Sequence, residues 1–249
     1  MGSVGAEFLK LKRSLSWAVV LLLPTVAIVT GTATTLASGH PLEDGWHTLW
    51  MRVVVFYGLF PLAIGVATLA SLVWRVEHQG GNWNALMSRS VPSAHVVLGK
   101  LSVLAVLAAA MQVVLVAGVV VVGELVFALP GTLPARYLPA SVVIVLACLP
   151  VAALQSGLSM LMRSFAAPVA VALPGAAAGV LLLMTGLEVP ATVLPYGLLG
   201  RATQLGTGMF IDGGAVTAGA VTTSAAAALV LTAAITAATA SLLDRLDIR

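Results

Sequence analysis

The segment Leu101–Gly123, LSVLAVLAAAMQVVLVAGVVVVG, contains no Asp, Glu, Lys or Arg. As a helix rising about 1.5 Å per residue, it is long enough to cross roughly 30 Å of bilayer hydrocarbon. Its apolar residues do not alternate with polar ones, as the strands of a membrane barrel would require. The segment therefore predicts a transmembrane helix, because a helix satisfies its own backbone hydrogen bonds in lipid.

The remainder of the chain has the same character. Of its 249 residues, 60% are hydrophobic and only 8% are charged, with a mean hydropathy of +1.08. Soluble domains contain about 25% charged residues, so this chain has too little charge to cover a surface in water. It contains no internal repeat, and we expect one all-α domain over residues 1–249. Long charge-free intervals predict six transmembrane helices, near 17–37, 52–73, 101–123, 139–162, 168–187 and 214–241.

Basic residues predict how the spans are oriented. With six spans both termini share one side, and that side would carry nine of the twelve basic residues. An excess of Lys and Arg marks the cytoplasmic side, so we expect a multi-pass protein of the cell membrane with both termini in the cytoplasm. The net charge of +3 follows from this topology, and nucleic-acid binding is not indicated. The nine residues are Lys10, Lys12, Arg13, Arg75, Arg89, Lys100, Arg163, Arg245 and Arg249.

Residues 1–16 predict a short amphipathic helix on the cytoplasmic membrane surface. Val4, Phe8, Leu11 and Leu15 recur at helical spacing and form one apolar stripe. We expect the polar flanks to meet lipid headgroups. The alternative is a basic flank of the first span with no surface helix. The polar flanks are Glu7, Lys10, Lys12 and Arg13.

The longest predicted cytoplasmic segment is Arg75–Lys100, RVEHQGGNWNALMSRSVPSAHVVLGK. Gly80-Gly81 is expected to end the preceding helix, and Asn82 is a candidate N-cap for a short helix over Trp83–Ser88. Pro92 suits the first turn of the next helix. The pattern of helix, break, short helix, break and helix is typical of a docking element.

Glu77 is the acidic residue that this segment singles out. It follows the second span within a basic loop, and we expect it to pair with Arg75, with Arg89 or with a partner protein. The alternative is a solvated carboxylate at a helix end.

Few polar side chains lie at membrane depth. Gln112 and Gln155 are the large ones, and each either lines a pathway or forms a hydrogen bond between neighbouring helices, which we favour. The spans carry no ionisable residue in their middle thirds, whereas ion-coupled transporters usually keep one there. This pattern argues against a secondary transporter that works alone.

The chain also lacks the sequence patterns of catalysis. It has no G-x-x-x-x-G-K-[ST], H-E-x-x-H or G-x-S-x-G, so we expect no ATPase site, no cofactor and no enzymatic activity of its own. The outer loop His40–His47 contains two His and two acidic residues, the only candidates for a metal site or a lipid-acting enzyme. Its Pro and Gly favour an irregular solvated loop.

Across the next outer loop, Glu124 and Arg136 are candidates for an exposed ion pair. The single cysteine, Cys148, is expected to pack inside the fourth span.

Three segments carry a family resemblance. Glu77–Pro92, EHQGGNWNALMSRSVP, followed by LGKL at Leu98–Leu101, resembles the loop between the second and third spans of type-2 ABC exporter permeases. That family commonly has there an acidic residue, a Gly step, an aromatic, Leu-x-Ser, a Pro and then Gly-Lys. AEFLKLKR at Ala6–Arg13 is similar to the family's opening, and the broken outer segment 188–213 before the last span matches its layout. The chain is most similar to the small permeases of antibiotic-export and lantibiotic-immunity systems.

The resemblance implies a permease subunit that pairs with a second permease and binds two copies of a separate ABC ATPase, which would hold ATP and Mg. The segment 82–88 would be the coupling helix, although Arg89-Ser90 departs from the family pattern. The expected substrate is hydrophobic or amphipathic: an antibiotic, a peptide or a lipid-like molecule. A membrane anchor that recruits an ATPase without transport is a further alternative. The implied docking residues are Glu77, Asn82, Trp83, Leu86, Met87 and Arg89.

Overall fold

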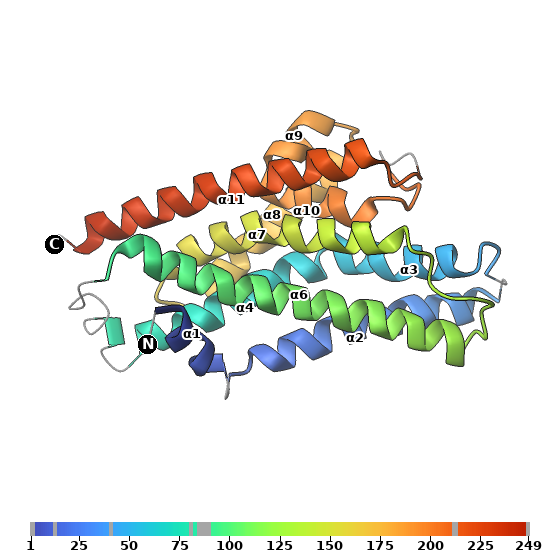
Figure 1. Ribbon diagram of the computed structural model, residues 1–249, viewed down its shortest axis with the longest axis horizontal. Coiled ribbons are helices and arrows are strands. Elements are labelled where there is room, and N and C mark those ends of the chain that lie inside the picture. Colours follow the sequence, from blue (N-terminus) through green and yellow to red (C-terminus); the bar gives the residue numbers. More distant parts are fainter. Residues whose placement is uncertain are drawn as a thin grey trace.

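The computed structural model describes residues 3–11, 14–39, 42–79, 82–83, 91–210 and 214–247, and these form helices and connecting turns without a strand. Seven of the helices are long, and they run along one elongated bundle (Figure 1). The long helices are α2 (Ser16–Ser38), α3 (Trp46–Leu59), α4 (Pro61–His78), α6 (Ser93–Leu125), α7 (Tyr137–Leu161), α8 (Ala166–Met184) and α11 (Ala218–Asp247). The short ones are α1 (Ser3–Lys10), α9 (Glu188–Val193) and α10 (Pro195–Gln204).

Membrane crossings number five or six in the described part of the chain. Five single helices, α2, α6, α7, α8 and α11, are long and apolar enough to cross a bilayer. The sixth crossing is the pair α3 and α4, which is bent by 49° at a short break. The polytopic, all-helical class predicted from the sequence is confirmed.

The second predicted span, 52–73, lies within a longer, bent pair of helices. The crossing runs from Trp46 to His78 and breaks at Phe60, where φ is −133°. Pro61 occupies the first turn of α4, and because proline has no N–H, it cannot continue the hydrogen-bond ladder of α3.

The third predicted span begins too late. Helix α6 starts at Ser93 rather than near 101, because Lys100 does not end the helix in water but is buried within it. The remaining boundaries, for α2, α7, α8 and α11, differ from the predicted spans by at most six residues.

Both ends of the chain lie at the same end of the bundle (Figure 1), as an even number of crossings requires. We call this end the basic end, because the ends of the helices placed there carry Lys10, Arg75, Lys100, Arg163 and Arg245. The opposite end carries Arg52 and Arg136. This arrangement agrees with the six-span topology predicted from the sequence.

Helix α7 forms the centre of the bundle. In its most apolar window 61% of the residues are buried, against 28–33% in the other four single-helix spans. Leu and Val side chains on the outer faces of α2, α6, α8 and α11 remain exposed, as expected where lipid is the solvent. The small residues of α11 are partly used within the subunit: a Cβ on Gly157 of α7 would come within 2.9 Å of Thr239 Oγ1.

In the outer segment before the last span, the described residues 188–210 include two short helices, α9 and α10. Helix α10 packs against α3, α7 and α8, and its Leu198, Leu199 and Ala202 are buried. Its approach to α3 is close, because a Cβ on Gly58 would lie 1.9 Å from Thr203 Oγ1. Protein therefore covers α10, whereas α9 is largely exposed, with Ala191 as its buried residue.

Candidate functional site

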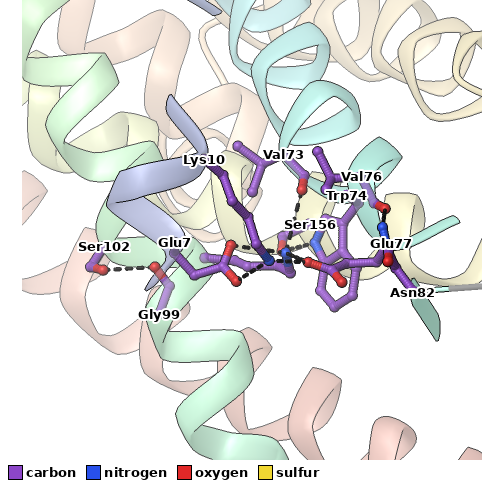
Figure 2. A network of polar contacts seen from close by, with 11 residues as sticks. Glu7, Lys10, Val73, Trp74, Val76, Glu77, Asn82, Gly99, Ser102 and Ser156 are labelled. Atoms are coloured by element: carbon purple, nitrogen blue, oxygen red, sulfur yellow. Dashed lines mark hydrogen bonds and ion pairs between the residues drawn. The ribbon is translucent and has the colours of Figure 1, made fainter. Parts of the chain in front are cut away.

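Three helices that are distant in sequence meet at the basic end. Helix α1 lies against α6, beside the last turns of α4 (Figure 1). Each contributes charged side chains to one cluster: Glu7 and Lys10 from α1, Glu77 from α4 and Lys100 from α6 (Figure 2). We call these four residues the charge ring.

Lys100 is the most deeply placed member of the ring. Its side chain is fully buried, and its Nζ lies 3.1 Å from Glu7 Oε2 and 3.0 Å from Glu77 Oε1. It also donates to the backbone carbonyl of Val73 at 3.3 Å. A lysine ammonium has three protons, so these three acceptors match its donors in number. The same nitrogen lies 4.7 Å from the centre of the Trp74 ring, where the negative π face adds further attraction.

Lys10 closes the ring on the outer side. Its Nζ lies 2.7 Å from Glu7 Oε1 and 2.5 Å from Glu77 Oε1. Each carboxylate therefore contacts both ammonium groups, and the two positive and two negative charges sum to zero. Desolvating a charge costs several kcal/mol, and this arrangement offsets the cost with opposite charges and hydrogen bonds on every member.

The charge of Lys10 is secured by its partners. Partial burial alone would lower the pKa of Lys10, but hydrogen bonds to the Glu7 and Glu77 carboxylates outweigh it and raise this pKa. A raised pKa means that Lys10 contributes its full stabilisation below the pKa of lysine in the unfolded chain, about 10.4. This stabilisation is lost as the pH rises through the pKa of Lys10 in the folded protein. The ion pairs of Lys10 are therefore intact at neutral pH.

The ring is joined to the central helix α7 through aromatic and polar contacts. Trp74 donates from Nε1 to Ser156 Oγ at 2.7 Å (Figure 2). The same Trp74 ring contacts the Lys100 ammonium. One turn further along α4, His78 Nε2 donates to the backbone carbonyl of Ser159 at 2.8 Å. The end of α4 is thus fixed to both α1 and α7.

The start of the predicted coupling helix is attached to the same end of α4. The Trp83 ring stacks on His78 at 5.5 Å between centroids, with an interplanar angle of 7°. Asn82 donates from Nδ2 to the carbonyl of Val76 at 2.8 Å, so its side chain caps the end of α4. The backbone N–H donors expected for an N-cap at Asn82, together with Leu86, Met87 and Arg89, lie outside the described residues.

Two predicted roles are corrected by the charge ring. Among the described residues, Glu77 pairs with Lys10 and Lys100 rather than with Arg75, and it is buried rather than solvated. Lys10 directs its ammonium toward carboxylates of the bundle rather than toward headgroups.

Of the other residues predicted for the surface helix, Phe8 is partly buried and packs against the core. Lys12 and Arg13 lie outside the described residues. The predicted helix over 1–16 is shorter, Ser3–Lys10.

The candidate pathway residues form hydrogen bonds between packed elements. Gln112 of α6 donates from Nε2 to Ser141 Oγ of α7 at 3.1 Å. Gln155 of α7 donates from Nε2 to Tyr196 Oη of α10. Both side chains are buried, so the structure favours the predicted helix-to-helix role over pathway lining.

The outer-loop candidates do not converge on one centre. His47 Nδ1 bonds Tyr137 Oη at 2.7 Å, and Arg136 donates to the same hydroxyl at 2.9 Å. In the part of the chain that the structure describes, Arg136 therefore has this partner instead of Glu124, and no three His, Cys, Asp or Glu side chains form a group that could hold a metal. His40 lies outside the described residues. Cys148 is buried in α7, as expected of a packing residue.

These features define a polytopic helical membrane protein whose charged residues gather at the ends of a lipid-exposed bundle. A family model described as ABC-2 family transporter protein matches residues 3–179, and the chain belongs to this family. The match includes all four members of the charge ring and ends within α8. No curated protein and no solved structure matches the chain.

Proposed function

We propose that the chain is the permease subunit of an ABC exporter and that the basic end lies in the cytoplasm. Family membership makes it a membrane subunit of a transporter. The distribution of Lys and Arg supports the orientation, because most of the described basic residues belong to helix ends that share the basic end with both termini.

The charge ring is the observation that carries the mechanism. It joins α1, α4 and α6 at the point where α4 leads into the segment 79–92 and α6 leaves it. A force applied to that segment by a closing ATPase would reach α4 and α6 together, and the ring would make α1 follow. Packed elements shift between discrete arrangements rather than deforming continuously, so the three helices would move as one body.

The partners in this proposal are two copies of an ABC ATPase and a second permease. Trp83 and Asn82 would seat the coupling helix, with Leu86, Met87 and Arg89 contacting the ATPase. Glu77 would act behind this surface by holding α4 in place, because its carboxylate is buried. The permease would have two conformations, whose cavity faces opposite sides of the membrane. ATP binding and hydrolysis would shift the population between them, because the two conformations have different affinities for ligands.

The proposed substrate is hydrophobic or amphipathic. The spans carry no charge in their middle thirds, and the outer helix faces present mainly Leu and Val. A pathway built from such surfaces suits an antibiotic, a peptide or a lipid-like molecule better than a small ion. The similarity to antibiotic-export and lantibiotic-immunity permeases stays a prediction.

If a gene beside this one encodes an ABC ATPase, co-purification of that ATPase with this chain tests the proposal. Trp83→Ala removes the stack on His78, and we expect at least a several-fold loss of bound ATPase and of coupled ATP turnover. Phe56→Ala, an aromatic replacement on the exposed side of α3, is the matched control and should retain both. Unchanged assembly and turnover in Trp83→Ala would contradict the docking assignment.

A further inference from the structure

A second polar feature lies at the basic end, on the side of α4 away from the charge ring. It is a cavity of about 290 Å³ between the last turns of α4, the end of α7 and the turn into α8. Two guanidinium groups, one imidazole and three hydroxyl groups line it, and none of the described residues in its lining carries a carboxylate. These residues are Arg75, Arg163, His78, Ser71, Ser159 and Ser164.

The positive charges of this cavity are not neutralised within the described part of the chain. Arg75 lies two residues before Glu77, which places the two side chains roughly 200° apart around α4. The described residues provide no carboxylate within ion-pair distance of Arg75 or Arg163, whereas Lys10 and Lys100 each have two. The Arg75 guanidinium is nevertheless positioned, because its carbon lies 5.9 Å from the centre of the Phe165 ring.

An apolar groove adjoins the cavity. It has a volume of about 550 Å³ and lies between α2 and α4, with Leu15, Leu22, Ile64 and Leu72 among its lining residues. Phe165 lines both the groove and the cavity, so that the two sites share one wall. A molecule that filled both would have an anionic end and an apolar chain.

We propose that the cavity and the groove together bind an anionic glycerophospholipid. Its phosphate lies between Arg75 and Arg163, since guanidinium groups form paired, charge-assisted hydrogen bonds with phosphate oxygens. One acyl chain lies in the groove between α2 and α4. Basic pockets between membrane helices are suited to anionic headgroups, and the size of this cavity is near the lower end of ordinary ligand pockets. The site is separate from the proposed transport function, and its binding can be measured without any ATPase.

Lipid retention by the delipidated full chain in detergent, measured by native mass spectrometry, tests this site. We expect dioleoyl phosphatidylglycerol to bind roughly tenfold more tightly than dioleoyl phosphatidylcholine, because the choline cation of the latter would lie near the two guanidinium groups and repel them. The variant Arg75→Gln/Arg163→Gln should lower the affinity for phosphatidylglycerol to that for phosphatidylcholine. Arg245→Gln, which removes an exposed charge from the same end outside the cavity, should leave the preference intact.

The groove is tested independently of the charges. Ala18 is exposed at the groove wall, and Ala18→Trp fills the space for the acyl chain without changing any charge. We expect this variant to weaken phosphatidylglycerol binding several-fold. Glycerophosphoglycerol, which has the headgroup without the chains, should bind much more weakly than the lipid.

Three results would overturn the proposal. The first is equal affinity of the unaltered chain for the two lipids. The second is an equal loss of preference in Arg245→Gln, which would indicate general surface charge. The third is binding of glycerophosphoglycerol or inorganic phosphate as tight as that of phosphatidylglycerol, which would make the cavity a site for free phosphate compounds.

Discussion

Lys100 shows how the side chain of a charged residue can be buried within a membrane helix. Its ammonium contacts two carboxylates and one carbonyl, at 3.1, 3.0 and 3.3 Å, and lies over the Trp74 ring. Replacing a complete set of buried charges by apolar residues is often neutral, whereas removing one member leaves an uncompensated charge. The stability of the charge ring is therefore expected to depend strongly on each of its four residues.

Lys100→Met should destabilise the protein by about 3–5 kcal/mol, because Glu7 and Glu77 lose their buried partner. The midpoint of unfolding by SDS, measured in mixed micelles, reports this change. The matched control Arg245→Gln, an exposed charge at the same end, should change the stability by less than about 0.5 kcal/mol.

The double variant Lys100→Met/Glu77→Gln separates a charge effect from a packing effect. It should be less destabilised than the sum of its two single variants, because the second change removes a carboxylate that the first left unpaired. Additive losses would show that the ring is not electrostatically coupled.

At the residue scale, the sequence identified the members of the ring but not their pairing. Ala6–Arg13, Glu77 and Gly99-Lys100 all carried the family resemblance, and their charges converge in the structure. The partners are separated by 67 and 93 residues, so helical spacing gives no sign of their contact. Span boundaries were predicted from the positions of charged residues, so Lys100 was expected to lie in water, outside the third span.

Individual elements show where charge spacing succeeds as a predictor and where it fails. It located α2, α7, α8 and α11 within six residues, because the boundary of a lipid-exposed span is set by the cost of burying charge. It missed the break between α3 and α4, since no charge marks Phe60 or Pro61. The bend depends on proline and on packing, which charge spacing does not report.

The contact between α3 and α10 gives an element-scale prediction. Gly58→Ala should destabilise the bundle by about 1–3 kcal/mol, as overpacking usually does, because the new Cβ would meet Thr203 atoms at 1.9 and 2.4 Å. Thermal unfolding in detergent measures the effect. In the control Gly219→Ala, the Cβ meets no atom within 4 Å, so the stability should stay the same or rise slightly. A neutral Gly58→Ala would mean that α10 does not pack this closely on α3.

The whole molecule has two distinct ends and a lipid-facing side surface. Composition predicted the membrane class, which is confirmed, and the charge-free intervals predicted six crossings, where the described residues provide five single spans and a sixth if the bent pair of α3 and α4 is one crossing. Contacts with other subunits would depend on the shape of the surface and on residues that come together only when this chain folds. Trp83 and His78 are such a pair. Charge counts and apolar periodicity report neither, so the partner surfaces could not be derived from the sequence alone.

The central claim is that the basic end faces the cytoplasm and holds an ABC ATPase next to the charge ring. Photo-crosslinking in intact cells that co-express the candidate ABC ATPase tests it most directly, with p-benzoylphenylalanine placed at position 83 or, as a control, at exposed position 135 of the opposite end. We predict a crosslink to the ATPase from position 83 and none from position 135. A crosslink from position 135, or none from position 83 while the two proteins co-purify, would contradict the claim.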